Sequence, residues 1–229
     1  MSDSIKHECG IAFIRLLKPL DYYFKKYGTW DWGLKKLYLL MEKQHNRGQD
    51  GAGLVSLKLN SSPGKEYIFR SRSNQREPIR HVFNIIADAQ KDFKENDNIE
   101  SIRENMPFIG EVMLGHLRYG TFGLNNIENI HPVLRRNNWK SKCLALAGNF
   151  NLTNVDEVFQ KLISLGQHPR GFSDTVTILE NIGHFLDEEN EEIFVKLRSE
   201  GKTKLECSPI IQKTLDIQLE SDSKTIDEI

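Results

Sequence analysis

The feature that most constrains the fold is a strand-like run that begins almost at the N-terminus. The residues His7-Glu8-Cys9-Gly10 are followed directly by the apolar run Ile11-Ala12-Phe13-Ile14. Nearly continuous apolar residues over so short a span indicate a strand that is buried on both faces, and we expect it to run from Cys9 to Leu17. A cysteine therefore stands at the head of an interior strand, with only eight residues before it.

Cys9 can be interpreted in two ways. If the first eight residues are removed, its thiol and its new α-amine form a nucleophile and a base within one residue, as in N-terminal nucleophile hydrolases. The plainer interpretation is a small buried hydrophobic side chain, which is the commoner role of a free cysteine. The other cysteines, Cys143 and Cys207, are distant and form no metal-binding pattern with it. We therefore expect no zinc or iron–sulfur site and a reducing, cytoplasmic environment.

Charge and hydropathy exclude several classes of protein. The net charge of −1 over 229 residues gives no indication of a nucleic acid or an acidic membrane surface as partner. The N-terminal eight residues lack the apolar segment of a secretory signal, and no run of about 18 apolar residues could span a membrane. The length indicates one large domain or two small ones.

The order of expected elements indicates the fold class. Leu34, Leu37, Tyr38 and Met41 recur at the spacing of an amphipathic helix packed on a sheet. A hairpin is expected over 54–59 and 67–70, and a solvated tail over 91–104. Further strands are expected within 111–121 and over 131–134 and 144–147, and helices over 154–166, 176–186, 191–197 and 208–219. Short groups of strands with helices before and after them predict an α+β fold of two stacked sheets, not a βαβ alternation.

Two glycine-rich stretches lie at the ends of expected strands. Asn46-Arg47-Gly48-Gln49-Asp50-Gly51-Ala52-Gly53 is a polar loop, in which we expect glycine to supply the positive φ of a tight turn. Gly115-His116-Leu117-Arg118-Tyr119-Gly120-Thr121 follows a strand that places His116 and Arg118 on one side. An arginine at a strand end is usually a plain surface residue, but it can also hold a carboxylate through two hydrogen bonds.

A third polar stretch follows the expected strand over 144–147. In Gly148-Asn149-Phe150-Asn151 the asparagines are either turn formers or a source of a side-chain amide for a developing oxyanion. Ser173-Asp174-Thr175 then begins a helix, where an aspartate is most often only a helix-start residue.

These stretches, together with Glu8-Cys9-Gly10, occur in the order found in class II glutamine amidotransferase domains. The chain resembles that family over about Cys9 to Leu186, and most of all the glutaminase domain of amidophosphoribosyltransferases. Each motif alone is a weak signal, whereas the ordered set is specific. The resemblance implies a four-layer αββα sandwich of two mainly antiparallel sheets and hydrolysis of the side-chain amide of glutamine.

The resemblance also implies a role for each matched residue. Residues 1–8 would be a propeptide and 9–229 the glutaminase domain with a polar C-terminal tail. The Cys9 thiolate would attack the amide, and the Asn149 side chain with the Phe150 N–H would form the oxyanion hole. The remaining residues would bind substrate (Arg118, Asp174, Tyr119, Thr121) or position Cys9 (Arg47, Gly48).

The partners expected from the resemblance are glutamine and a phosphoribosyltransferase domain that this chain lacks. The full enzyme would pass ammonia to phosphoribosyl pyrophosphate in the first step of purine synthesis, as a homo-oligomer. We expect no cofactor in the glutaminase domain, and Mg²⁺ only in the missing one. The alternatives are the glutaminase half of an asparagine, glutamate or hexosamine-phosphate synthase, and a degenerate domain that binds glutamine or a partner without turnover.

The chain departs from the family at three places. The usual His-Asn-Gly-Asn is Gly148-Asn149-Phe150-Asn151 here, and a phenylalanine tolerates positive φ poorly where a glycine does not. The usual Ser of the Arg-Tyr-Ser-Thr run is Gly120. The aromatic segment Lys18 to Lys36 is longer than usual, and its role is unexplained.

Overall fold

The computed structural model of the protein describes residues 8–94, 98–120, 126–207 and 209. The chain divides into two compact units, Met1–Val133 with Leu146–Phe150 and Leu134–Ala145 with Asn151–Ile229. The strands form a four-stranded sheet in the first unit and a two-stranded sheet that lies mostly in the second. The predicted α+β class with two antiparallel sheets is therefore confirmed.

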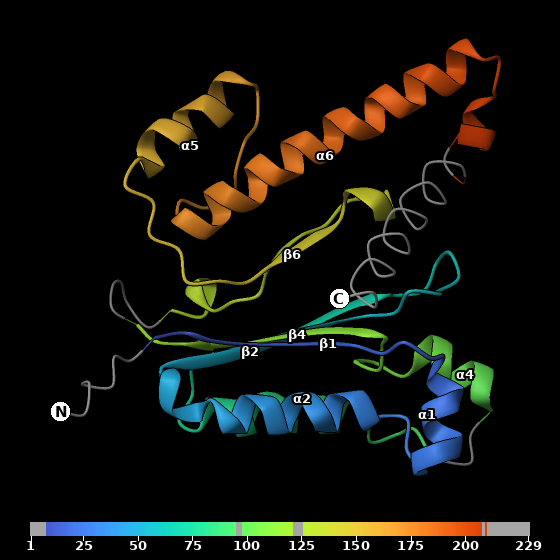
Figure 1. Ribbon diagram of the computed structural model, residues 1–229, viewed down its shortest axis with the longest axis vertical. Helices are drawn as coiled ribbons and strands as arrows, with labels where there is room; N and C mark the ends of the chain where they lie inside the picture. Colours follow the sequence, from blue (N-terminus) through green and yellow to red (C-terminus); the bar gives the residue numbers. More distant parts are fainter. Residues whose placement is uncertain (1–7, 95–97, 121–125, 208, 210–229) are drawn as a thin grey trace, which may run out of the picture. The chain divides into compact units, whose positions relative to one another are not determined.

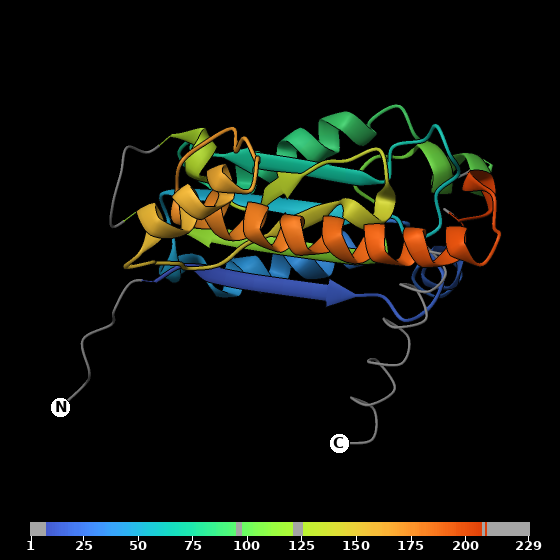
Figure 2. The same ribbon diagram turned by 90° about the horizontal axis from the view of Figure 1, so that it is seen from above.

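The sheet of the first unit contains β1 (Gly10–Arg15), β2 (Gly51–Leu57), β3 (Ile68–Ser73) and β4 (Val112–Arg118). The strand order is β1-β4-β2-β3 with antiparallel neighbours, so β1 forms one edge and β3 the other (Figures 1 and 2). The prediction that the first strand is buried on both faces is wrong. Ile11 and Phe13 are 46% and 59% exposed, because an edge strand is paired on one side only and alternates its side chains between two faces.

Helices cover one face of this sheet. The first unit contains α1 (Leu20–Tyr27), α2 (Trp32–Lys43), α3 (Pro78–Gln90) and α4 (Ile99–Asn105), with short 3-10 turns η1 (His45–Arg47) and η2 (Ile127–Asn129). Figure 1 shows α2 along the sheet, where it contacts β1 and β4, while α3 contacts β2 and β3. The hairpin of β2 and β3 and the predicted helix over 34–41 are confirmed.

The core between helices and sheet explains why this unit holds together. Its central side chains come from α2, α3 and three strands, and those exposed by 1% or less include Leu37, Met41, Leu54, Val82, Ile86, Met113 and Leu117. Each contributes about 1.5–3 kcal/mol by leaving water. Ile102 of α4 is equally buried, so the expectation of a solvated tail over 91–104 is wrong for its second half.

The second unit contains β5 (Val133–Arg135), η3 (Lys140–Lys142), β6 (Leu144–Leu146), α5 (Val155–Ser164) and α6 (Asp174–Ser199). The helix α5 packs on α6. The two separate helices predicted over 176–186 and 191–197 are one, because Asp187 does not break the helix. Its carboxylate lies 2.5 Å from the Arg135 guanidinium, which also pairs with Glu180 at 3.3 Å. The helix expected over 208–219 falls almost wholly outside the described residues.

Candidate functional site

Cys9 lies at the head of β1 against the end of β4. It precedes Gly10, which pairs with Leu117, and its Sγ accepts a hydrogen bond from the Tyr119 N–H at 3.5 Å. The thiol is partly buried, and Sγ is also 3.9 Å from the Tyr119 carbonyl oxygen. The expected nucleophile and the segment that begins at Arg118 are therefore brought together by strand pairing. The sulfur is oriented by a main-chain N–H that any residue other than proline at position 119 retains.

The loop from Arg47 to Asp50 packs directly on this strand end. A Cβ on Gly48 would stand 2.7 Å from the carbonyl carbons of Leu117 and Arg118, so no other residue fits there. The Asp50 N–H donates to the Arg118 carbonyl at 3.1 Å, and the Asp50 carboxylate accepts the Gly120 N–H at 2.7 Å. Asp50 thus fastens the loop to residues 118–120, a role that we did not assign to it from the sequence.

The glycines of this loop are required for close approach and not for unusual backbone angles. Gly48, Gly51 and Gly53 are absent from the described glycines with positive φ, so the turn expected here from φ > 0 is wrong. A Cβ on Gly51 would stand 2.7 Å from the Ile130 side chain, and one on Gly53 would stand 2.2 Å from the His131 carbonyl oxygen. The segment 130–131 therefore lies on the sheet face that β2 presents at these two positions.

Arg47 and Arg118 occupy different environments. Arg47 is exposed and forms an ion pair with Glu8 at 3.2 Å, a surface contact of little energetic weight. Arg118 is partly buried on the face of β4 that also bears His116, as the alternation predicted. Its Nη1 donates to the Asn129 carbonyl at 2.5 Å. Arg118 is thus held near Cys9 by the sheet, whereas Thr121, which we predicted to bind substrate, lies outside the described residues.

The stretch Gly148–Phe150 is held by His131. The Nδ1 of His131 lies 3.0 Å from the Gly148 carbonyl oxygen and 3.4 Å from the Gly148 N–H. Asn149 is exposed, as a donor that meets a substrate must be. Phe150 is absent from the described non-glycine residues with positive φ, which are Glu77 and Phe108. Phenylalanine is therefore compatible with the backbone at 150, and the role of its N–H as an oxyanion donor stays a prediction.

The half-buried His131 ring lies beside that of a buried histidine, His116. Their ring centroids are 4.7 Å apart, and His116 is 1% exposed. Burial lowers the pKa of His116 to about 3, with the neighbouring His131 contributing. Burial likewise lowers the pKa of His131 to about 4, opposed by its bond to Gly148. Neither ring nitrogen of His116 has a partner at hydrogen-bond geometry, although the Gly148 carbonyl is near enough to oppose the fall in its pKa. Both imidazoles are neutral at physiological pH.

Asp174 belongs to the second unit, whereas the other described residues of the predicted site belong to the first. It is the first residue of α6, after the N-cap Ser173, whose hydroxyl accepts the Val176 N–H. The Asp174 carboxylate accepts the Leu152 N–H at 3.0 Å. It therefore has the helix-start role expected of an aspartate here, and its substrate contact stays a prediction.

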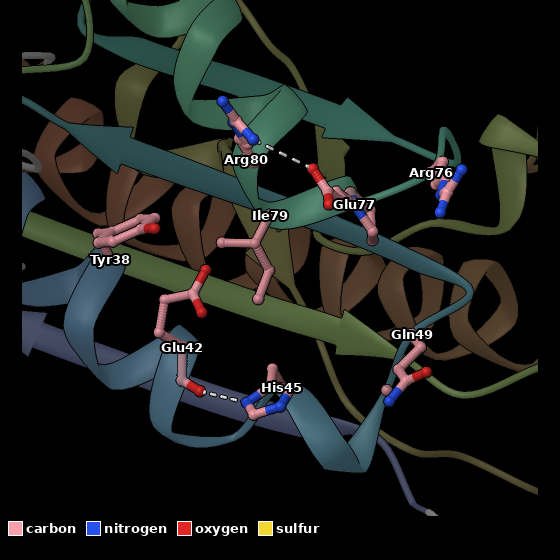
Figure 3. Close-up of a pocket in the computed structure, with 10 residues that line it drawn as sticks. Tyr38, Glu42, His45, Gln49, Arg76, Glu77, Ile79 and Arg80 are labelled. Carbon is pink, nitrogen blue, oxygen red and sulfur yellow. Dashed lines mark hydrogen bonds and ion pairs between the residues drawn. The ribbon is translucent and has the colours of Figure 1, made fainter.

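A cavity of about 560 Å³ opens between the end of α2 and the start of α3, and Figure 3 shows the side chains that line it. Glu42 and His45 lie on one side and Glu77 and Arg80 on the other, the last two ion-paired at 3.4 Å. Among the residues that line this cavity, Gly48 also belongs to the predicted site. The lining does not include Cys9, so we do not assign this cavity to the attacked substrate.

Sequence reasoning missed Asp50, His116 and His131 as parts of the site. Asp50 and His116 stand inside the motifs that were singled out, and His131 precedes a proline in the extended piece before β5. The side chains of Asp50 and His131 bond backbone groups that are distant in sequence, and the His116 ring contacts that of His131; spacing alone does not reveal such contacts. Within the part of the chain that the structure describes, no three metal-binding side chains gather, and none of the helices is long and apolar enough to cross a membrane.

Comparison with known proteins supplies an independent test of the resemblance. No protein-family model matches the chain. A protein of Lacticaseibacillus casei named amidophosphoribosyltransferase is 30% identical over 146 residues, which is 63% of this chain and 61% of that protein. One of Bacillus subtilis with the same name is 30% identical over 154 residues, 65% of this chain and 26% of that one. The chloroplastic amidophosphoribosyltransferase 3 of Arabidopsis thaliana is 29% identical over 63% of this chain and 22% of its own.

A solved structure also aligns with part of the chain. The glutamine phosphoribosylpyrophosphate amidotransferase of B. subtilis, complexed with ADP and GMP, aligns with 74% of this chain and 28% of its own, with a TM-score of 0.43 and 24% identity. The chain thus spans from about a fifth to three fifths of the length of the curated relatives described above. The sequence relationship that the ordered motifs indicated is confirmed.

Proposed function

Because the chain is related in sequence to amidophosphoribosyltransferases, we propose that it is the glutaminase part of such an enzyme, a glutamine amidotransferase of purine synthesis. It hydrolyses glutamine to glutamate and ammonia. The observation that carries the proposal is the position of Cys9. Its sulfur is partly buried, contacts the Tyr119 N–H, and lies beside a loop that tolerates only glycine at position 48.

Before any turnover, hydrolysis of the Glu8–Cys9 peptide bond removes residues 1–8 and frees the Cys9 α-amine. An α-amine has a reference pKa of roughly 7.7–8.0, so it can accept and return a proton near neutral pH. It takes the thiol proton while the sulfur attacks the amide carbon of glutamine. The same proton then goes to the departing nitrogen, which leaves as ammonia, and a glutamyl thioester remains. Water, deprotonated by the amine, attacks the thioester to release glutamate and restore the thiol.

The tetrahedral intermediates carry a negatively charged oxygen, which hydrogen-bond donors must stabilise. The Asn149 side-chain amide and the Phe150 N–H supply them, and donors of this kind typically contribute about 10²–10³ to kcat. Arg118 holds the substrate α-carboxylate and Asp174 its α-ammonium, with Tyr119 and Thr121 on the segment that covers glutamine. A site that pairs both charged ends rejects a plain amide, because its own charges would then be left unpaired.

In the longer enzyme, ammonia is passed to phosphoribosyl pyrophosphate by a phosphoribosyltransferase domain. That domain carries the Mg²⁺ requirement, whereas the glutaminase part needs no cofactor. We place the enzyme in the cytoplasm as a homo-oligomer. The same glutaminase chemistry would serve an asparagine, glutamate or hexosamine-phosphate synthase, and the acceptor is identified by assaying the full-length protein with each acceptor and [amide-¹⁵N]glutamine.

The test of the chemistry is direct. Purified protein incubated with glutamine should release glutamate and ammonia in equal amounts, and Cys9→Ala should abolish both while leaving the unfolding transition unchanged. The competing function is a binding domain without turnover, which the departures at Gly148 and Phe150 favour. Calorimetry that detects glutamine binding to a protein releasing no ammonia would support that alternative and contradict the proposal.

A further inference from the structure

The two departures from the usual motif, at positions 148 and 150, are joined in space. A Cβ built on Gly148 would stand 2.3, 2.6 and 2.9 Å from three carbons of the Phe150 ring, distances that real Cβ atoms essentially never show. The Phe150 ring therefore occupies the place where a side chain at 148 would stand. Since Gly148 is buried and has no positive φ, space and not backbone conformation keeps it a glycine.

His131 holds the same segment from another direction. Its Nδ1 either donates to the Gly148 carbonyl oxygen at 3.0 Å or accepts the Gly148 N–H at 3.4 Å, depending on the tautomer. Its ring lies 4.7 Å from the buried His116 ring and 6.4 Å from that of Phe150. Its own carbonyl oxygen rests on Gly53 of the sheet. His131 thus connects residues 148–150 to the sheet that contains Arg118.

We propose that His131 and Phe150 are positioning residues that fix the Asn149 side chain and the Phe150 N–H at the oxyanion, the Phe150 ring acting as a clamp over Gly148. The inference rests on the proposed function, because it assigns these donors to the glutaminase reaction. Oxyanion donors must lie within about 2.7–3.1 Å of the developing charge. A displacement of about 1 Å can cost on the order of 10²-fold in rate, so what holds the segment matters as much as the donors.

The clamp is tested by a double-mutant cycle on Gly148→Ala and Phe150→Ala. In the wild type, Gly148→Ala pushes the ring away and should lower kcat for glutamine about ten- to a hundredfold, with KM changed less than about threefold. In Phe150→Ala, which has already lost the ring, adding Gly148→Ala should lower kcat by less than about threefold more. Equal effects of Gly148→Ala in both backgrounds would overturn the clamp.

The role of His131 is tested by rescue. His131→Ala should lower kcat by a similar factor, whereas His131→Asn should recover most of it, because an amide near the Nδ1 position can donate or accept. His81→Ala is the matched control, since His81 contacts Ser73 and lies outside the site. Circular dichroism melts identify any variant that fails to fold. If one fails, the less severe Phe150→Leu is used in its place, and the NMR shifts of the Asn149 and Phe150 amides are compared with those of the wild type instead of the rate.

The outcomes separate the two proposals. A correctly processed wild type with no glutaminase activity refutes the proposed function and the positioning role with it. An active wild type whose kcat is unchanged in Gly148→Ala, Phe150→Ala and His131→Ala refutes the positioning role alone. An active wild type with the expected coupling and the rescue by asparagine supports both.

Discussion

Replacement of Gly48 by alanine should damage both stability and the site. The new methyl carbon would stand 2.7 Å from the carbonyl carbons of Leu117 and Arg118, where ordinary van der Waals contact begins at 3.4 Å. These are backbone atoms of β4, which is paired on both sides and cannot yield. The loop must therefore move outward by about 0.7 Å, the difference between the two distances. Such a shift lengthens the 3.1 Å bond from the Asp50 N–H beyond hydrogen-bond range.

The expected loss of stability is about 2–4 kcal/mol, from overpacking at about 1–3 kcal/mol and a lost hydrogen bond at about 1 kcal/mol. Urea unfolding gives the total, and hydrogen exchange at the Asp50 and Gly120 amides reports the loop itself. Gly171→Ala is the matched control, since the nearest atom to its Cβ is 4.0 Å away. A Gly48→Ala protein within about 0.5 kcal/mol of the wild type, with both amides still protected, would refute the reasoning.

Two further predictions concern the charges of the site. Because burial lowers the pKa of His116 to about 3 and of His131 to about 4, the unfolded chain, whose histidines titrate near 6.5, binds protons first as pH falls. Stability should therefore fall between about pH 6.5 and pH 3, with the His131 contribution complete near pH 4, and be insensitive to these groups above that range. Urea midpoints against pH should show a shallower slope in His131→Asn, and an identical slope would contradict the neutral state of His131 in the folded protein. Arg118→Lys keeps the charge but loses the planar fork, so KM for glutamine should rise roughly tenfold or more in steady-state assays. The lost bond to the Asn129 carbonyl should lower stability by only about 1 kcal/mol in the melt. An unaltered KM would remove Arg118 from the substrate site.

The parts of the fold that could be predicted from the sequence are those that depend on residue spacing within a single helix or strand. The spacing of Leu34, Leu37, Tyr38 and Met41 gave the boundaries of α2 closely, because a helix that packs on a sheet needs an apolar stripe of that period. Alternation likewise placed His116 and Arg118 on one face of β4. The edge position of β1 was missed, because an apolar run does not say how many neighbours its strand will have.

The errors share a cause, which is that a residue's partner lies far away in sequence. The charged run that starts at Asp187 predicts a break between the helices over 176–186 and 191–197, yet Asp187 pairs with Arg135 and the helix continues. The sequence singles out the glycines at 48, 51 and 53, but it does not show why glycine is required there. A sequence shows that a position is glycine, whereas only the packed segment shows whether it needs positive φ or room for a neighbour.

The ring of Phe150 illustrates the same limit within the site. From the sequence, phenylalanine in place of the usual glycine raised the prospect of a distorted loop. The backbone at 150 has no positive φ, and the ring fills the space that Gly148 leaves. The two departures compensate each other, which becomes visible once both positions are placed in three dimensions.

The central claim is that Cys9, once N-terminal, is the nucleophile, and one mass-spectrometric experiment addresses it. The protein is incubated with the glutamine analogue 6-diazo-5-oxonorleucine and analysed intact and after peptide mapping, with Cys9→Ala treated in parallel. The account predicts a chain that starts at residue 9 and carries one covalent adduct on Cys9, with none in the variant. A protein that retains Met1 to Glu8 after prolonged incubation, or whose label falls on Cys143 or Cys207, would contradict it.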